Sequence, residues 1–299
     1  MNREPEPGLH PSADGPNSSA TPPDAESAHC SAEPCAGLLI VNADDWGRDR
    51  ETTGRTLDCV LCGTVSSVSA MMFMEDSERS AAIAREQRID AGLHLNFTTS
   101  FSAPRIPARL SGHQQRLSLY LRRYRFSQVV FHPGLIRSFE YVVAAQRDEF
   151  IRLYGREPDR LDGHHHMHLC ANVLLGGLLP PGTVVRRNFS FQPGEKSFGN
   201  RLYRHAVDRA LARRHRLTDL FFSLHPLTPP GRLERIFELS SQFVVEVATH
   251  PHEPAEYSFL TDGGIRKLGG NHSVAPGFES ALVRTRSANS CLPLCPMPK

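Results

Sequence analysis

Residues 38–47 read Leu-Leu-Ile-Val-Asn-Ala-Asp-Asp-Trp-Gly, so four apolar side chains are followed, after Asn42 and Ala43, by the acidic pair Asp44 and Asp45. A short apolar run that stops at carboxylates is typical of a buried strand whose end faces a functional site. Histidines follow strand-like segments downstream, in Gly92-Leu-His-Leu95 and in Asp162-Gly-His-His-His-Met-His168. Carboxylate oxygens and imidazole nitrogens are the ligands that zinc-like divalent ions prefer. These segments together predict a catalytic metal site.

Length and composition place the chain among globular α/β proteins. It has 299 residues, is 39% hydrophobic and carries a formal net charge of +2. A chain of this length can bury a large core, as one sizeable domain or two small ones. The net charge is too small to indicate a nucleic acid or an anionic membrane as a partner by itself. No segment approaches the roughly 20 apolar residues that a membrane-spanning helix needs, so we expect a soluble, cytoplasmic protein.

Composition also divides the chain into three parts. Residues 1–36 are rich in Pro, Ser, Ala and Glu, with almost no large apolar side chains, and predict a disordered N-terminal tail. Residues 37–265 are expected to form the folded domain, and residues 266–299 to form a poorly ordered C-terminal tail. Four of the seven cysteines, Cys30, Cys35, Cys291 and Cys295, lie in the tails, so no disulfide framework is predicted.

From Leu38 onward, strand-like and helix-like segments alternate, which predicts βα units around a parallel sheet. The expected strands are residues 38–43, 65–72, 91–97, 160–162, 183–189, 220–223 and 243–249. The expected helices are residues 52–62, 76–88, 138–154, 171–179, 200–215 and 233–239. Residues 105–125 interrupt the alternation with many arginines; they predict a solvated insertion or helix, with an anionic-ligand or subunit contact as the alternative.

Chemistry-bearing residues fall at the ends of the expected strands. Asp44, His94, His164 and His250 all do so, and the carboxyl ends of parallel strands meet at one edge of a sheet. Asp44 and Asp45 would point in opposite directions on a regular strand, so the chain must bend to bring both into one pocket. One carboxylate could then bind a metal while the other accepts a proton. The alternative is that the pair caps the next helix.

The histidine-rich segment is the second strong signal. Extended geometry would align Asp162, His164, His166 and His168 on one face, and four histidines in five residues are hard to explain by packing alone. The pattern indicates a metal but does not say which histidine binds it. His94, taken alone, is also compatible with a buried core histidine.

Two further histidines precede proline. His250 ends a convincing strand and is placed to act as a general acid, whereas we interpret His225 as structural. Cys59-Val-Leu-Cys62 has the spacing of a redox motif, but it lies inside an expected helix and favours packing.

Residues 42–47, 92–95, 161–168 and 246–251 together resemble the YdjC-like carbohydrate deacetylases, the family that includes chitooligosaccharide deacetylase and the hopanoid-associated deacetylase-like proteins. The four segments occur in the family's order over roughly residues 38–260. The resemblance implies an incomplete, TIM-like (β/α) barrel related to polysaccharide deacetylases. It also implies one divalent metal ion, Mg or Zn-like, held by Asp45, His94 and His164, with Asp44 as the catalytic base and His250 as the acid.

We therefore expect a metal-dependent hydrolase that removes an N-acetyl group from an amino sugar or oligosaccharide and releases acetate. The alternatives are another metal-dependent hydrolase, such as a phosphoesterase, or a degenerate family member that binds a glycan or metal without turnover. Arg186 or Arg187 is a candidate for orienting substrate, with a solvated basic pair as the alternative reading. The expected partner is an N-acetylated saccharide, with no nucleic acid and no membrane span; a homodimer is compatible with the sequence.

Overall fold

The computed structural model describes residues 37–123, 126–190, 197–268 and 274–278. These residues contain a seven-stranded sheet in the order β5-β4-β3-β2-β1-β7-β6. Each pair of neighbouring strands is parallel, as the alternation of segments predicted. The strands are β1 (Leu38–Trp46), β2 (Ser67–Ala70), β3 (Asp90–Leu95), β4 (Arg160–Gly163), β5 (Val184–Val185), β6 (Leu220–Ser223) and β7 (Val244–Thr249).

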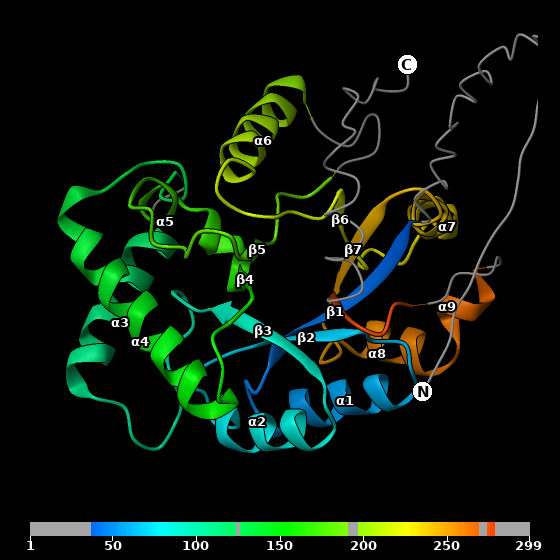
Figure 1. Cartoon of the computed structure of the whole chain (residues 1–299), viewed down its shortest axis with the longest axis horizontal. Coiled ribbons are helices and arrows are strands. Elements are labelled where there is room, and N and C mark those ends of the chain that lie inside the picture. Colours follow the sequence, from blue (N-terminus) through cyan, green and yellow to red (C-terminus); the bar gives the residue numbers. More distant parts are fainter. Residues whose placement is uncertain (1–36, 124–125, 191–196, 269–273, 279–299) are drawn as a thin grey trace, which may run out of the picture. The chain divides into compact units, whose positions relative to one another are not determined.

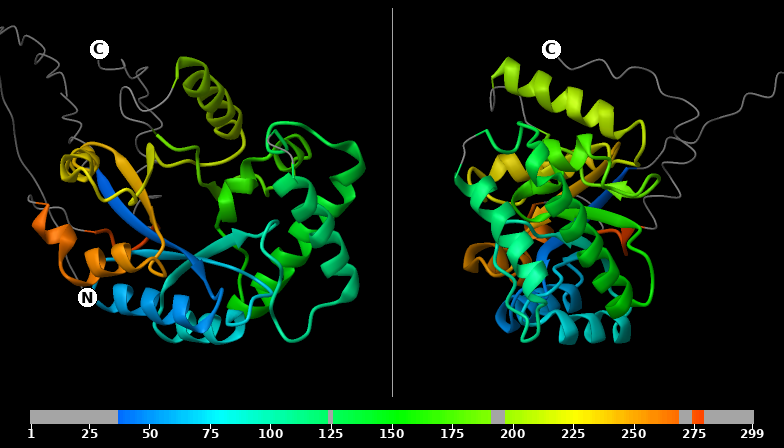
Figure 2. Two further views of the ribbon diagram at one scale, coloured as in Figure 1. Left: turned by 180° about the vertical axis from the view of Figure 1, so that it is seen from behind. Right: turned by 90° about the vertical axis from the view of Figure 1, so that its left-hand side faces the viewer.

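Helices cover the outer face of the curved sheet (Figures 1 and 2). They are α1 (Arg50–Leu61), α2 (Ser77–Glu86), α3 (Ala108–Arg123), α4 (Ile136–Tyr154), α5 (Ala171–Leu175), α6 (Phe198–Leu211), α7 (Pro230–Leu239), α8 (Pro254–Thr261) and α9 (Gly264–Lys267), with 3-10 turns η1 (Pro133–Leu135) and η2 (His164–Leu169). Helix α1 contacts β1, α4 contacts β3, and α7 contacts β7. In the described residues, no helix is long and apolar enough to cross a bilayer.

The sheet is an incomplete barrel, which confirms the predicted fold class. Its two edge strands, β5 and β6, are not paired with each other as strands. Irregular backbone beside them makes the remaining contacts: the amide of Val185 donates to the Arg216 carbonyl at 2.9 Å, and the amide of Ser190 donates to the Phe221 carbonyl at 2.7 Å. In the described residues, backbone hydrogen bonds from irregular segments therefore bridge the space between β5 and β6, but these two strands do not pair.

Strand β1 lies at the centre of the sheet and separates an apolar layer from a polar one. Leu39, Val41 and Ala43 belong to the main hydrophobic core. Asn42 and Asp44 occupy the alternate positions, and the Asn42 amide donates to the Asp44 carboxylate at 2.9 Å. Because strand side chains alternate between faces, the helices pack on the apolar layer and the polar side chains line the barrel interior.

The helix that the sequence allowed within residues 105–125 is present as the 16-residue α3. Other local expectations need correction. Residues 183–189 form only a two-residue strand. Residues 164–169 form η2 instead of continuing β4 in extended geometry. The predicted tail of residues 1–36 lies outside the described residues, but part of the predicted C-terminal tail is packed on the domain: Ala275 donates its amide to the Leu39 carbonyl at 2.8 Å.

Candidate active site

A bend at the end of β1 places two adjacent carboxylates in one pocket. Asp45 has φ of 64°, and the pairing of β1 with β2 shifts register between Ala43 and Trp46. The bend overcomes the alternation that would otherwise send Asp44 and Asp45 to opposite faces. Neither residue caps the following helix; the side chain of Asp49 does so, accepting the Thr52 amide at 2.7 Å.

Asp45 meets two imidazoles from different elements. Its Oδ1 atom lies 2.8 Å from His164 Nδ1 and 3.3 Å from His94 Nε2. All three residues are buried, and their candidate ligand atoms lie within 4.8 Å of one another. One carboxylate and two imidazoles are a donor set that suits a zinc-like divalent ion. The residues present therefore fit the metal that the sequence predicted.

Asp162 fixes the orientation of the His94 ring. His94 Nδ1 lies 2.8 Å from an Asp162 oxygen, so the Nδ1 hydrogen is donated to the carboxylate and Nε2 faces Asp45. Burial disfavours a charged imidazole, but Asp162, Asp45 and Asp44 outweigh it and raise the pKa of His94 to about 10. Burial likewise opposes ionisation of Asp45, yet hydrogen bonds from His164 and His94 hold its pKa well below the ordinary value.

The histidine-rich segment contributes one member to this donor set. Extended geometry ends at Gly163, and His165 and His166 adopt left-handed backbone angles, with φ of 54° and 57°. A Cβ atom at Gly163 would lie 3.0 Å from the amide nitrogen of His168, so glycine permits the tight turn. The Nε2 atom of His168 lies 2.9 Å from the Arg186 carbonyl oxygen, so this ring links two segments of the barrel wall and does not face the candidate metal ligands. The prediction of one aligned histidine face was wrong because the turn separates the rings.

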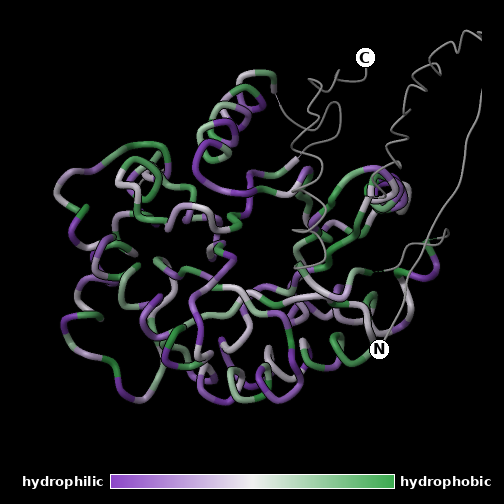
Figure 3. The backbone as a smooth tube through the Cα atoms, in the orientation of Figure 1, coloured by the Kyte–Doolittle hydropathy of each residue, from purple (hydrophilic) through white to green (hydrophobic). Residues whose placement is uncertain are grey.

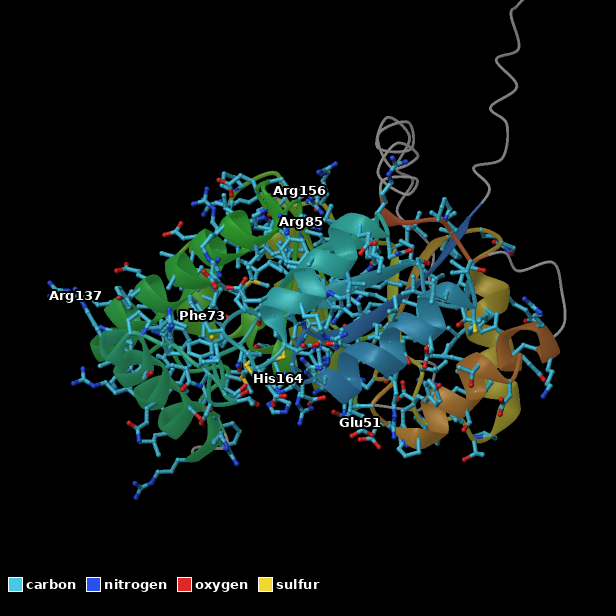
Figure 4. All side chains as sticks on the ribbon, turned by 90° about the horizontal axis from the view of Figure 1, so that it is seen from below. Glu51, Phe73, Arg85, Arg137, Arg156 and His164 are labelled. Atoms are coloured by element: carbon cyan, nitrogen blue, oxygen red, sulfur yellow. The ribbon has the colours of Figure 1, made fainter. Side chains whose placement is uncertain are left out.

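His165 lies on the exposed side of the same turn. Its Nδ1 atom is 2.9 Å from the hydroxyl of Thr98, and its ring centroid is 4.0 Å from that of His164. Burial and the neighbouring His164 lower the pKa of His165 to about 4. In Figure 4 the labelled His164 lies between the green helices and the blue ones, whereas the labelled Arg137 projects outward at the left edge.

Arg186 is a buried cation beneath Asp44. Its side chain is only 1% exposed, and its Nη1 and Nη2 nitrogens donate to the two Asp44 oxygens at 2.7 and 2.8 Å. It also contacts Glu246 at 2.6 Å and Asp162 at 2.7 Å. Because it is buried, Arg186 is not half of a solvated basic pair. Its predicted contact with substrate stays a prediction. In the structure, the guanidinium holds Asp44 in position.

Arg186 also sets the charge of the pocket. Burial would raise the pKa of Asp44, but the guanidinium and His94 lower it below the ordinary value, so Asp44 is a carboxylate at neutral pH. Asp44, His94 and Asp162 form a second group with metal-ligand spacing. Because Arg186 already binds both carboxylates of that group, a second cation there would meet a positive charge. Asp45, His94 and His164 are the better candidate site.

His250 follows β7 and reaches the same pocket. Its Nε2 atom lies 3.8 Å from Asp44 Oδ2, and its side chain is 35% exposed. The backbone is fixed by Glu256 on α8, whose carboxylate accepts the His250 amide at 2.7 Å and the Thr249 hydroxyl at 2.6 Å. The sequence offered no signal for Glu256, because a lone glutamate within a helix is indistinguishable from a solvated one.

Comparison with known proteins identifies the family of this chain. The YdjC-like protein family matches residues 38–267, and the chain belongs to that family. It is 31% identical to a chitooligosaccharide deacetylase of Proteus mirabilis over 46% of this chain and 53% of that protein. It is 30% identical to a carbohydrate deacetylase of Mus musculus over 58% of this chain and 56% of that protein. The chain thus spans about half the length of the curated relatives it matches.

A solved structure supports the fold. An Enterococcus faecalis protein with a proposed role in cellobiose-phosphate cleavage superimposes with a TM-score of 0.57, covering 82% of this chain and 99% of the other at 18% identity. At this identity the likeness concerns the fold alone.

Proposed function

We propose that this chain is a metal-dependent hydrolase that removes an N-acetyl group from an amino sugar or its oligosaccharide. The observation that carries the proposal is the convergence of Asp45, His94 and His164 on one point beside Asp44 and His250. Membership of a family whose relatives are named chitooligosaccharide and carbohydrate deacetylases supports the choice of reaction. The products would be acetate and a free amine.

One group of residues would bind the metal ion, and another would transfer protons. A divalent ion held by Asp45, His94 and His164 would polarise the amide carbonyl and make the attacking water more acidic. Asp44 accepts a proton from that water, since Arg186 keeps it ionised and aimed into the pocket. The water oxygen bonds to the carbonyl carbon, and the bond between that carbon and nitrogen breaks.

His250 completes the reaction by donating a proton to the departing nitrogen. Its side chain is partly exposed and lies beside Asp44, so the acid and the base face the same opening. An imidazole suits this role because its ordinary pKa lies close to neutral pH. Asp162 contributes indirectly, by fixing the ring of His94.

A two-ion phosphoesterase is less well supported. Such enzymes place two cations about 3.5 to 4 Å apart. In the described residues, the second acidic group that could provide another site, Asp44 with Asp162, is already bound to Arg186.

Acetate release from N,N'-diacetylchitobiose tests the proposed function. The purified protein should release acetate with Zn, Co, Ni or Mn, and lose the activity in a chelator. Asp44→Asn should keep metal but lower kcat by about 10² to 10⁴. His94→Ala should lose metal and activity together. Asp262→Asn, at an exposed position in the turn after α8, is the matched control. Full turnover in Asp44→Asn would reject its role as the base.

A further inference from the structure

The region around α3 carries an unusual charge distribution. From Ala91 to Phe139 the sequence contains no aspartate or glutamate, yet it contains seven arginines. No ion pair reaches five exposed members of this group within the described ranges: Arg105, Arg109, Arg116, Arg122 and Arg137. The small net charge of the whole chain therefore conceals a concentrated positive surface.

Apolar side chains are exposed between these arginines. On α3, Leu110, Leu117 and Leu121 pack into the core, whereas Leu119 is 64% exposed. Leu119 is three residues from Arg116 and three from Arg122, so it lies between the two on the solvent side of the helix. An apolar residue flanked by arginines on an outward face does not serve the core.

The loop that follows α3 extends this apolar surface. Val129, Val130 and Phe131 are 46%, 51% and 38% exposed, and Figure 3 colours much of the loop between α3 and α4 as hydrophobic. The loop is fixed in place, because Tyr120 donates its hydroxyl to the Val130 carbonyl at 3.1 Å. Val129 also lines an apolar cavity of about 360 Å³ shared with α5 and α6.

Hydrogen bonds on the other side of the loop hold the same geometry. The amide of His132 donates to the side chain of Asn172 at 2.9 Å, and Asn172 donates back to the His132 carbonyl at 2.9 Å. Gln128 reaches the carbonyl of His166, in the turn that carries His164, at 3.3 Å. The exposed apolar loop is therefore attached to the candidate active site.

We propose that the α3 surface, defined as Arg116, Leu119 and Arg122 with Val129–Phe131, docks onto an anionic lipid bilayer. Arginines beside exposed aliphatic and aromatic residues are the composition of interfacial membrane-binding segments. The arginines bind lipid headgroups, and Leu119, Val130 and Phe131 enter the boundary with the acyl chains. The protein lies on the membrane and does not span it.

The charge and the exposed apolar residues of the α3 surface favour a lipid bilayer over a second copy of the chain or a nucleic acid. Pairing this surface with its own copy would bring arginine against arginine, with no acidic residue from Ala91 to Phe139 to compensate. A nucleic acid would use the arginines but would leave Leu119 and Val130 in water, because its backbone offers no apolar layer. A bilayer with anionic headgroups satisfies both features.

Cosedimentation of the full chain with vesicles tests the proposal. We expect binding to phosphatidylcholine vesicles that contain phosphatidylglycerol, weakening as salt is raised, and little binding to phosphatidylcholine alone. Arg116→Gln combined with Arg122→Gln should weaken binding about thirtyfold, since each arginine near an anionic surface contributes about 1 kcal/mol. Leu119→Ser combined with Val130→Ser should weaken it several-fold at unchanged net charge.

Matched controls separate this surface from general effects. Arg85→Gln with Arg88→Gln removes the same charge from exposed positions at the end of α2, and Leu61→Ser removes an apolar side chain that is 68% exposed on α1. Both control proteins should bind like the wild type. Equal loss in the controls, or no preference for anionic vesicles, overturns the proposal. So does binding to RNA without vesicle binding, or a dimer that Leu119→Ser with Val130→Ser dissociates without vesicle binding.

Discussion

At the scale of single residues, Arg186 links the chemistry of the pocket to its stability. One guanidinium contacts Asp44, Asp162 and Glu246, and all four side chains are buried. Burial opposes the charge on Arg186, but the three carboxylates raise its pKa well above the ordinary value. Removing the cation would leave several acidic groups facing one another without water.

Arg186→Met should therefore lower the free energy of unfolding by about 3 to 5 kcal/mol. Adding Glu246→Gln should recover part of the loss, because one buried carboxylate is then neutral. Urea denaturation of both proteins measures the effect. Arg152→Gln, which breaks the exposed pairs with Glu78 and Glu149, is the control and should cost less than about 1 kcal/mol. Equal losses in Arg186→Met and the control would contradict the assigned role.

Metal binding should depend on pH through His94. In the metal-free protein the pKa of His94 is about 10, so its imidazole is protonated at neutral pH. A cation must displace that proton, so apparent affinity should increase with pH, by up to about tenfold per unit below pH 10. Calorimetric titration with Zn²⁺ in two buffers of different ionisation enthalpy measures both affinity and proton release. Affinity that stays constant between pH 6.5 and 8.5 would exclude this linkage.

At the scale of elements, two glycines in helices have opposite roles. Gly54 lies inside α1, where an added Cβ meets open space. Gly155 ends α4 in the left-handed conformation, with φ of 70°. The first position would accept a side chain, whereas the second would force one into a disfavoured backbone region.

Gly54→Ala should stabilise the protein by about 0.5 to 1 kcal/mol, and Gly155→Ala should destabilise it by about 1 kcal/mol. Thermal unfolding of the two proteins beside the wild type measures the difference. The same sign of change in both would show that backbone conformation does not decide these positions.

The elements also show what sequence patterns can predict. Apolar runs and helical periodicity placed β1, β3 and β7 and the helix ending at Gly155, because each signal is local and strong. Residues 164–168 were misinterpreted because left-handed angles at His165 and His166 depend on close packing around Gly163. The strand expected at residues 183–189 shrank to two residues, since its neighbour on the open edge is irregular backbone.

The sequence also identified part of the candidate site and missed the rest. Asp44, His94, His164 and His250 were identified because each falls at or near the end of an expected strand, and the carboxyl ends of parallel strands meet at one edge of a sheet. Their roles remain predictions. Glu256 and the buried position of Arg186 were missed because both depend on contacts between segments far apart in the sequence.

At the scale of the whole domain, a distant segment packs against the first strand. Val274 pairs with Leu39, the amide of Phe278 donates to Asp90 at 2.7 Å, and the guanidinium of Arg160 lies 4.2 Å from the Phe278 ring centroid. Phe278 is 3% exposed in a small cluster with Ile40 and its neighbours. No sequence pattern predicted this contact, because the segment is short and polar on both sides.

Phe278→Ala should lower the free energy of unfolding by about 3 kcal/mol, because it empties a buried aromatic site. Affinity for Zn²⁺ should not change, since the ligands lie at the other ends of the strands. Phe198→Ala, at a position that is 79% exposed, is the control and should change stability by less than about 0.5 kcal/mol. A loss no larger than that of the control would show that the packed segment adds nothing to stability.

Anomalous diffraction from crystals grown with Zn²⁺ is the most direct test of a single metal centre. We predict one strong peak about 2.0 to 2.2 Å from a carboxylate oxygen of Asp45 and one nitrogen each of His94 and His164. The peak should vanish in His94→Ala and persist in Asp44→Asn. A peak centred between Asp44 and Asp162, or no peak among these residues in the wild-type protein, would contradict the account.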